Sequence, residues 1–163
     1  MVVPILGRGV LLHLRYAKEM RTELVTTRED YDYLLTRGID CLYDRRFHLE
    51  IGLRREIQKE RFGGNNAEGN AKFYNYCLRH FAHVCENCGK PITNPTATNV
   101  SHILTRGSHP EMAHDPRNVS ILCWECHNLY EHSTTRDQLR MWYVEKTERI
   151  KQELKQEYNG INA

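Results

Sequence analysis

The sequence contains no long hydrophobic run. Its longest apolar stretches, Val2–Leu6 and Val10–Leu12, are much shorter than the roughly 18 residues that a membrane-spanning helix needs. Arg8 and Arg15 interrupt any signal-peptide core, and no small-residue cleavage site follows them. Low-complexity tracts and internal repeats are also missing. We therefore expect a folded cytoplasmic protein rather than a membrane, secreted or fibrous one.

Neither sign of charge dominates, because 23 Lys and Arg face 21 Asp and Glu, for a net charge of +2. A balance this mild neither requires nor excludes a nucleic-acid partner. The 163 residues are enough for one domain, or for a small module with extensions. Residues 81–140 stand out, since they hold six of the nine His and four of the six Cys but only five Lys or Arg. This imbalance predicts a functional site in that segment.

Four of the cysteines form two C-x-x-C pairs, Cys85-Glu-Asn-Cys88 and Cys123-Trp-Glu-Cys126. Two thiolates three residues apart on a tight turn can bind one metal, and two such pairs complete the tetrahedral four-sulfur shell of a structural Zn²⁺. Gly89 suits the sharp turn after the first pair. A thioredoxin-like redox motif would need one C-x-x-C beside a βαβ pattern, which this sequence does not have. We expect the isolated Cys41 and Cys77 to be buried as small hydrophobic residues.

The N-terminal third is predicted to be mainly helical. Apolar residues recur at helical spacing over residues 31–57, after a cap at Thr26 or Thr27. Glycines such as Gly38 weaken the prediction of one unbroken helix. The earlier stretch, Val2–Arg15, is compatible with a strand pair or an arm.

Residues 63–69 are rich in Gly and Asn, which indicates a loop or linker. Beyond them, periodicity and capping residues predict a helix over 70–81, strands over 98–104 and 119–123, a helix over 124–132 and a C-terminal helix that starts within 133–137. We therefore expect three parts: an N-terminal helical region (1–69), a zinc module (70–132) and a C-terminal helix (133–163).

The central pattern resembles the HNH endonuclease family, also called the ββα-metal nucleases, in its four-cysteine zinc form. The matching segments are Cys85-x-x-Cys88, Ser-His102-Ile, Asp-Pro-Arg-Asn118-Val and Leu-Cys123-x-x-Cys126-His127. They cover about residues 80–132, and their surroundings are similar to small HNH proteins of phages and mobile elements. The resemblance implies an α+β fold in which a small ββα zinc module is flanked by N-terminal helices and a C-terminal helix.

The resemblance also implies metal-dependent hydrolysis of phosphodiester bonds in DNA. His102 fits the general base, Asn118 fits the residue that orients it, and His127 fits a ligand of a catalytic divalent ion, such as Mg²⁺ or Mn²⁺. The expected partner is DNA in a bacterial or phage-infected cell. A homodimer formed through a terminal helix is compatible with the sequence.

One position departs from the family pattern. Many members carry Asp or His immediately before the first motif His, where this chain has Ser101, a poor ligand for Mg²⁺ or Mn²⁺. Glu131 lies one helical turn after His127 and could replace the missing ligand. Other candidates are His132, His109, His114 and Asp115. The alternative is a non-catalytic, zinc-dependent module that binds nucleic acid.

Arginines in two segments are candidates for phosphate contacts. They are Arg106 and Arg117 in the central module and Arg45, Arg46, Arg54 and Arg55 in the N-terminal region. The alternative for all six is an ordinary solvated or salt-bridged surface.

Overall fold

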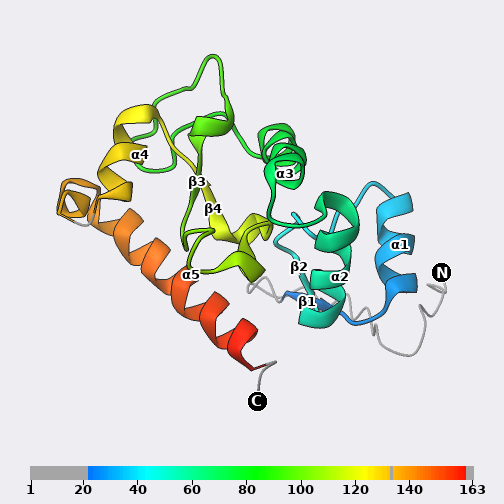
Figure 1. Ribbon diagram of the computed structural model, residues 1–163. Coiled ribbons are helices and arrows are strands. Elements are labelled where there is room, and N and C mark those ends of the chain that lie inside the picture. Colours follow the sequence, from blue (N-terminus) through cyan, green and yellow to red (C-terminus); the bar gives the residue numbers. More distant parts are fainter. Residues whose placement is uncertain (1–21, 133, 161–163) are drawn as a thin grey trace, which may run out of the picture. The chain divides into compact units, whose positions relative to one another are not determined.

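The computed structural model describes residues 22–132 and 134–160, so the stretch Val2–Arg15 lies outside them. The described residues form two compact units, which divide between Glu60 and Arg61. Both combine helices with a two-stranded sheet, which confirms the α+β prediction (Figure 1). The expected part boundaries after residues 69 and 132 stay predictions.

The N-terminal unit pairs strand β1 (Glu23–Val25) in parallel with β2 (Phe47–Leu49) and carries helices α1 (Arg28–Thr36) and α2 (Ile51–Phe62). Thr27 caps α1, as predicted, and its hydroxyl accepts the N–H of Asp30 at 3.2 Å. The helical pattern over residues 31–57 is interrupted in the structure, as its glycines indicated. The chain leaves α1 through Gly38, whose φ of 77° is favourable only for glycine, and β2 follows before α2 begins.

The C-terminal unit begins with α3 (Ala67–His80), where Asn66 caps the helix by accepting the N–H of Gly69. Strands β3 (Val100–His102) and β4 (Val119–Ile121) pair antiparallel, with His102 opposite Val119. Helices α4 (Trp124–Glu131) and α5 (Met141–Asn159) complete the unit. In Figure 1, β3 and β4 lie between α3 and α4, and short 3₁₀ turns (η1, Ala97–Asn99; η2, Pro110–Met112; η3, Pro116–Asn118) connect the strands to their surroundings.

The C-terminal helix starts later than predicted. Residues 136–138 form a 3₁₀ turn, η4 (Arg136–Gln138), and α5 begins only at Met141. The Thr135 hydroxyl donates to the carbonyl oxygen of Leu129 at 3.0 Å, and the N–H of Arg140 donates to Asn87 Oδ1 at 2.9 Å. These bonds connect the segment to α4 and to the first cysteine turn.

Two groups of side chains form the core of the C-terminal unit. The first surrounds the cysteines and joins α4 to α5 through Leu122, Tyr130, Leu139 and Tyr143. The second is aromatic, with Phe62 in edge-to-face contact with Phe73 and Tyr76. Cys41 and Cys77 are completely buried, as predicted.

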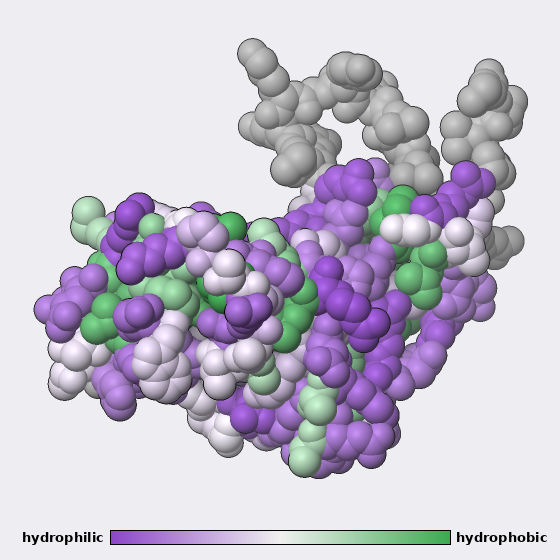
Figure 2. All heavy atoms as spheres, turned by 90° about the horizontal axis from the view of Figure 1, so that it is seen from above, coloured by the Kyte–Doolittle hydropathy of each residue, from purple (hydrophilic) through white to green (hydrophobic). Residues whose placement is uncertain are grey.

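Hydrophilic residues dominate the face drawn in Figure 2, and hydrophobic residues form small separate groups on it. Only six large hydrophobic side chains of the described residues are exposed: Leu24, Leu35, Val84, Trp124, Met141 and Trp142. Within the described ranges, no helix combines the length and apolar character needed to cross a membrane.

Candidate active site

The four C-x-x-C cysteines meet at one point of the C-terminal unit. Their sulfurs lie within 4.8 Å of one another, and the sulfurs of Cys88 and Cys123 are 3.8 Å apart. Four sulfurs bound tetrahedrally at about 2.3 Å to one zinc ion are separated by about 3.8 Å. The cluster therefore fits Zn²⁺, and four protein ligands leave no open position for a substrate, as in a structural zinc site.

The backbone around this cluster favours metal binding. Gly89, with φ of 78°, makes the tight turn after Cys88, and its N–H donates to the Cys85 carbonyl at 2.9 Å. Burial raises the pKa of the Cys123 and Cys126 thiols. At Cys85, backbone N–H groups of residues 87, 88 and 123 outweigh burial and lower the pKa, so these bonds stabilise the thiolate of Cys85, which is the form that binds zinc.

His102 ends β3 and is only 8% exposed. Its Nε2 lies 2.9 Å from the carbonyl oxygen of Ala113. Because a carbonyl oxygen can only accept, Nε2 must carry the hydrogen and donate it. The neutral ring then presents an unprotonated Nδ1, whose lone pair can accept a proton.

The surroundings of His102 keep its ring neutral. Burial lowers the pKa of His102 to about 4, and the bond to Ala113 offsets only part of that effect. The positive charge of Arg106 lowers this pKa further. At neutral pH the ring is therefore available as a base.

Asn118 is completely buried and connects the two ends of the β3–β4 loop. Its Oδ1 accepts the N–H of Leu104 at 2.8 Å, and its Nδ2 donates to the carbonyls of Leu104 and Met112 at 2.9 and 3.1 Å. Met112 directly precedes Ala113, whose carbonyl holds His102. Asn118 can therefore position the base, and its buried place leaves no room for contact with a substrate.

His127 and Glu131 lie one turn apart on α4. His127 Nδ1 is 2.6 Å from the carbonyl oxygen of Thr98, so Nδ1 carries a hydrogen and donates it. His127 Nε2 is 3.1 Å from Glu131 Oε1. If the ring is neutral and its hydrogen is on Nδ1, then His127 Nε2 and Glu131 Oε1 are both acceptors. Two acceptors this close together are favourable only if a proton or a metal cation lies between them.

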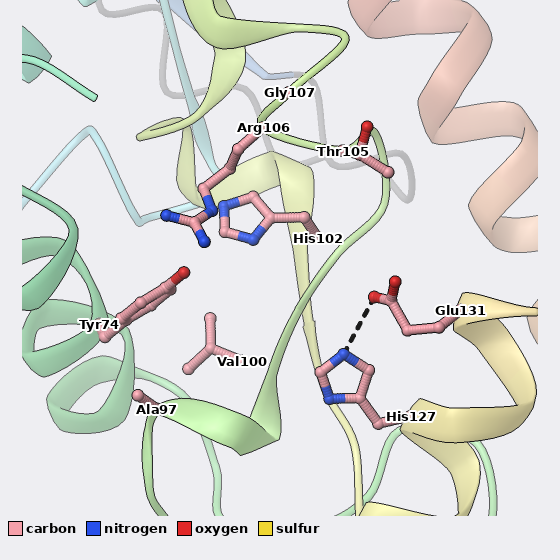
Figure 3. A pocket seen from close by; sticks show the side chains of 9 residues that line it. All are labelled: Tyr74, Ala97, Val100, His102, Thr105, Arg106, Gly107, His127 and Glu131. Carbon is pink, nitrogen blue, oxygen red and sulfur yellow. Dashed lines mark hydrogen bonds and ion pairs between the residues drawn. The ribbon is translucent and has the colours of Figure 1, made fainter. Parts of the chain in front are cut away.

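His102, His127 and Glu131 share one pocket of about 320 Å³. Its lining consists of Tyr74, Ala97, Val100, His102, Thr105, Arg106, Gly107, His127 and Glu131. Figure 3 shows His102 beside Arg106, Tyr74 facing them, and His127 paired with Glu131 across the pocket. The Arg106 guanidinium lies 5.6 Å from the centre of the Tyr74 ring, and none of the described carboxylates forms an ion pair with it. The pocket thus combines a base, a free cationic group and a His–carboxylate pair.

Residues 85–133 match the family model described as HNH endonuclease. These residues form an HNH endonuclease module. The match confirms the resemblance drawn from the sequence, and it assigns this HNH module a nuclease-type function in general terms. Neither a curated protein nor a solved structure matches the chain.

Ser101 does not line the pocket of the HNH module. It is 1% exposed, and because side chains alternate along a strand it points away from the face that carries Val100 and His102. The other substitute ligands also lie outside the lining: His109, His114, Asp115 and His132. Glu131 is the carboxylate that the structure brings to His127.

Two of the arginines predicted to contact phosphate have other partners in the structure, which does not favour that role. Arg54 is 1% exposed, and its guanidinium points to the Leu42 carbonyl inside the N-terminal unit. The Arg117 guanidinium is bound to Asp115 and Glu157, so its donors are already used. Arg106 lines the pocket, whereas Arg45, Arg46 and Arg55 are exposed on the N-terminal unit, and Arg46 is paired with Asp44.

Sequence reasoning missed Tyr74. It lies on α3, outside the HNH match, and nothing in its local sequence distinguishes it from the other aromatic residues of that helix. Only the fold brings it opposite His102 and Arg106.

Proposed function

We propose that this protein is a metal-dependent endonuclease that hydrolyses phosphodiester bonds in DNA. The observation that supports this most is the shared pocket, in which the free Nδ1 of His102 and the His127–Glu131 pair both face one cavity. We also place its activity in the cytoplasm of a bacterial or phage-infected cell, where DNA is available.

In this reaction His102 Nδ1 accepts a proton from water as the water oxygen bonds to phosphorus and the bond from phosphorus to the leaving oxygen breaks. The leaving oxygen keeps the electron pair of that bond and takes a proton from solvent. His102 Nε2 keeps its bond to Ala113, which stabilises the imidazolium that forms. Arg106 has no carboxylate partner among the described residues and can bind a non-bridging phosphate oxygen. Asn118 keeps the loop and the base in place.

The pair on α4 fits a divalent cation. Neighbouring ligands at about 2.1 Å from one ion, at right angles, are about 3.0 Å apart, which is close to the 3.1 Å between His127 Nε2 and Glu131 Oε1. When bound there, Mg²⁺ or Mn²⁺ would neutralise charge on the phosphate and on the leaving oxygen. Since imidazole suits Mn²⁺ better than Mg²⁺, we expect manganese to support the faster reaction.

A plasmid-nicking assay with Mg²⁺, Mn²⁺ or EDTA tests the proposal. We expect cleavage with either ion and none with EDTA, and His102→Ala should reduce the rate by about 10²–10⁴-fold while zinc content stays constant. His83→Ala is the matched control, because His83 is exposed and lies outside the pocket. DNA binding without cleavage would instead support a non-catalytic zinc module, the alternative that the buried Ser101 favours.

A further inference from the structure

We infer that α5, which lies beyond the HNH match, positions the general base through Tyr158 and Glu157. These two residues hold Asp115 and Arg117, and so fix the loop whose Ala113 carbonyl orients His102. The inference rests on the proposed function, since it names the residues that align the base of that same site.

The first step is the connection from the base to Asp115. Ala113 lies two residues before Asp115, which is 0% exposed and is the N-cap residue of η3. The Asp115 carboxylate accepts the backbone N–H of Arg117 at 3.0 Å and the Arg117 Nη2 at 2.7 Å. The buried Asp115 carboxylate therefore binds the backbone and the side chain of Arg117, and so holds together the loop that carries the Ala113 carbonyl.

The second step is the connection from Asp115 to α5. The Tyr158 hydroxyl donates to Asp115 Oδ2 at 3.0 Å, and Arg117 Nη1 donates to Glu157 Oε2 at 2.7 Å. Tyr158 is itself buried, and Glu157 is only 18% exposed at its side chain. A buried carboxylate is stable as an ion only when it is paired and hydrogen-bonded, and α5 supplies part of that pairing.

The third step is that different parts of α5 contact the zinc core and the loop that holds the base. The N-terminal half of α5 packs into the zinc core through Tyr143 and Val144, whereas Glu157 and Tyr158 contact the base-holding loop near its C-terminal end. Removing one hydroxyl or one negative charge at that end leaves the zinc core packed. The expected result is a misaligned base in a folded protein.

Tyr158→Phe and Glu157→Gln test the inference in the full-length, zinc-loaded protein. We expect kcat for cleavage of duplex DNA with Mn²⁺ to fall at least about tenfold, with KM and zinc content close to wild type, because small displacements of a base reduce the rate strongly. The melting temperature should fall as well, because each change removes a partner of the buried Asp115–Arg117 pair, but the variants should remain folded at the assay temperature. Glu153→Gln is the matched control, since Glu153 lies on the same helix and forms an exposed pair with Arg149. An unchanged kcat in both variants would overturn the inference.

A second measurement does not depend on activity. In ¹⁵N-labelled protein, the His102 Nε2–H should exchange slowly with solvent because it is bonded to Ala113. Tyr158→Phe should speed this exchange at least about tenfold, and Glu153→Gln should leave it unchanged. Slow exchange in all variants would overturn the inference even if the wild-type protein failed to cleave DNA, and fast exchange in Tyr158→Phe alone would support it whatever the outcome for the proposed function.

Discussion

His102 has lost most of its contact with water, and this loss controls its protonation. Burial lowers the pKa of the ring to about 4, compared with about 6.5 in an unfolded chain. Between these two pH values the unfolded chain binds a proton that the folded protein does not bind. The contribution of His102 to the free energy of unfolding is therefore complete above pH 6.5, and it decreases as the pH falls toward 4.

The difference between the folded and unfolded pKa values of His102 predicts that the stability of the protein depends on pH through this one side chain. The shift corresponds to a loss of at most about 3 kcal/mol between pH 6.5 and 4. Urea unfolding at several pH values should show the wild-type midpoint falling over this range more steeply than that of His102→Gln. Parallel curves for the two proteins would mean that His102 is not buried in its neutral form.

The pair on α4 predicts a change in metal requirement. Glu131→Gln removes the negative charge but keeps the size of the side chain, so a bound cation would lose a charged ligand and keep at most a neutral amide oxygen. The Mn²⁺ concentration that gives half-maximal cleavage should rise about tenfold or more, with zinc content unchanged. Glu145→Gln, an exposed change on α5, is the control. A titration identical to wild type would eliminate Glu131 as a ligand.

Among the described secondary-structure elements, α4 is connected most directly to the four-cysteine cluster. Cys123 is its N-cap residue without making a side-chain capping bond, and Cys126 lies in its first turn. The core around these cysteines is small, so the metal must supply much of the energy that folds it.

We therefore expect Cys123→Ser to lose zinc and to lower the melting temperature of the C-terminal unit strongly. Cys77→Ser, at a buried cysteine away from the cluster, is the control, and it should retain zinc. Circular dichroism and a zinc-binding dye measure the two effects. A Cys123→Ser variant that kept its fold and its nuclease activity would contradict a structural four-cysteine site.

The elements of the HNH module could be predicted because their signals are local. Two cysteine pairs, Gly89 and the alternation around His102 each constrain only a few neighbouring residues. The start of α5 could not be predicted, because it depends on the bond from Arg140 to the distant Asn87. Charge partners were equally hidden: Arg117 is bound by Glu157, which lies 40 residues further along the chain.

The burial of Arg54 in the N-terminal unit could not be predicted from the sequence either. A helical segment with several arginines indicates a basic surface, but α2 turns Arg54 inward while Arg55 remains exposed. Which side of a helix is buried depends on its neighbours, and single-sequence spacing does not determine them for a face with mixed charges.

For the chain as a whole, DNA affinity should depend on salt. Exposed arginines that contact phosphates release counterions, so Arg45→Gln together with Arg55→Gln should reduce the slope of log affinity against log salt concentration by about one unit per lost contact. Exposed Arg79, replaced by Gln, serves as the comparison on the C-terminal unit. A slope equal to that of wild type would leave these two side chains as ordinary solvated residues.

Helix α4 contains the proposed zinc ligand Cys126 and the His127–Glu131 pair proposed to hold the other cation. A second proposed zinc ligand, Cys123, is its N-cap residue. Two ions bound through one short helix are thermodynamically linked, because each binds best to the same ordered helix. Zinc should then raise the affinity for the second ion, and by reciprocity the second ion should slow the release of zinc. Zinc supply would in this way control how much of the protein holds the second ion, and with it the proposed cleavage of DNA.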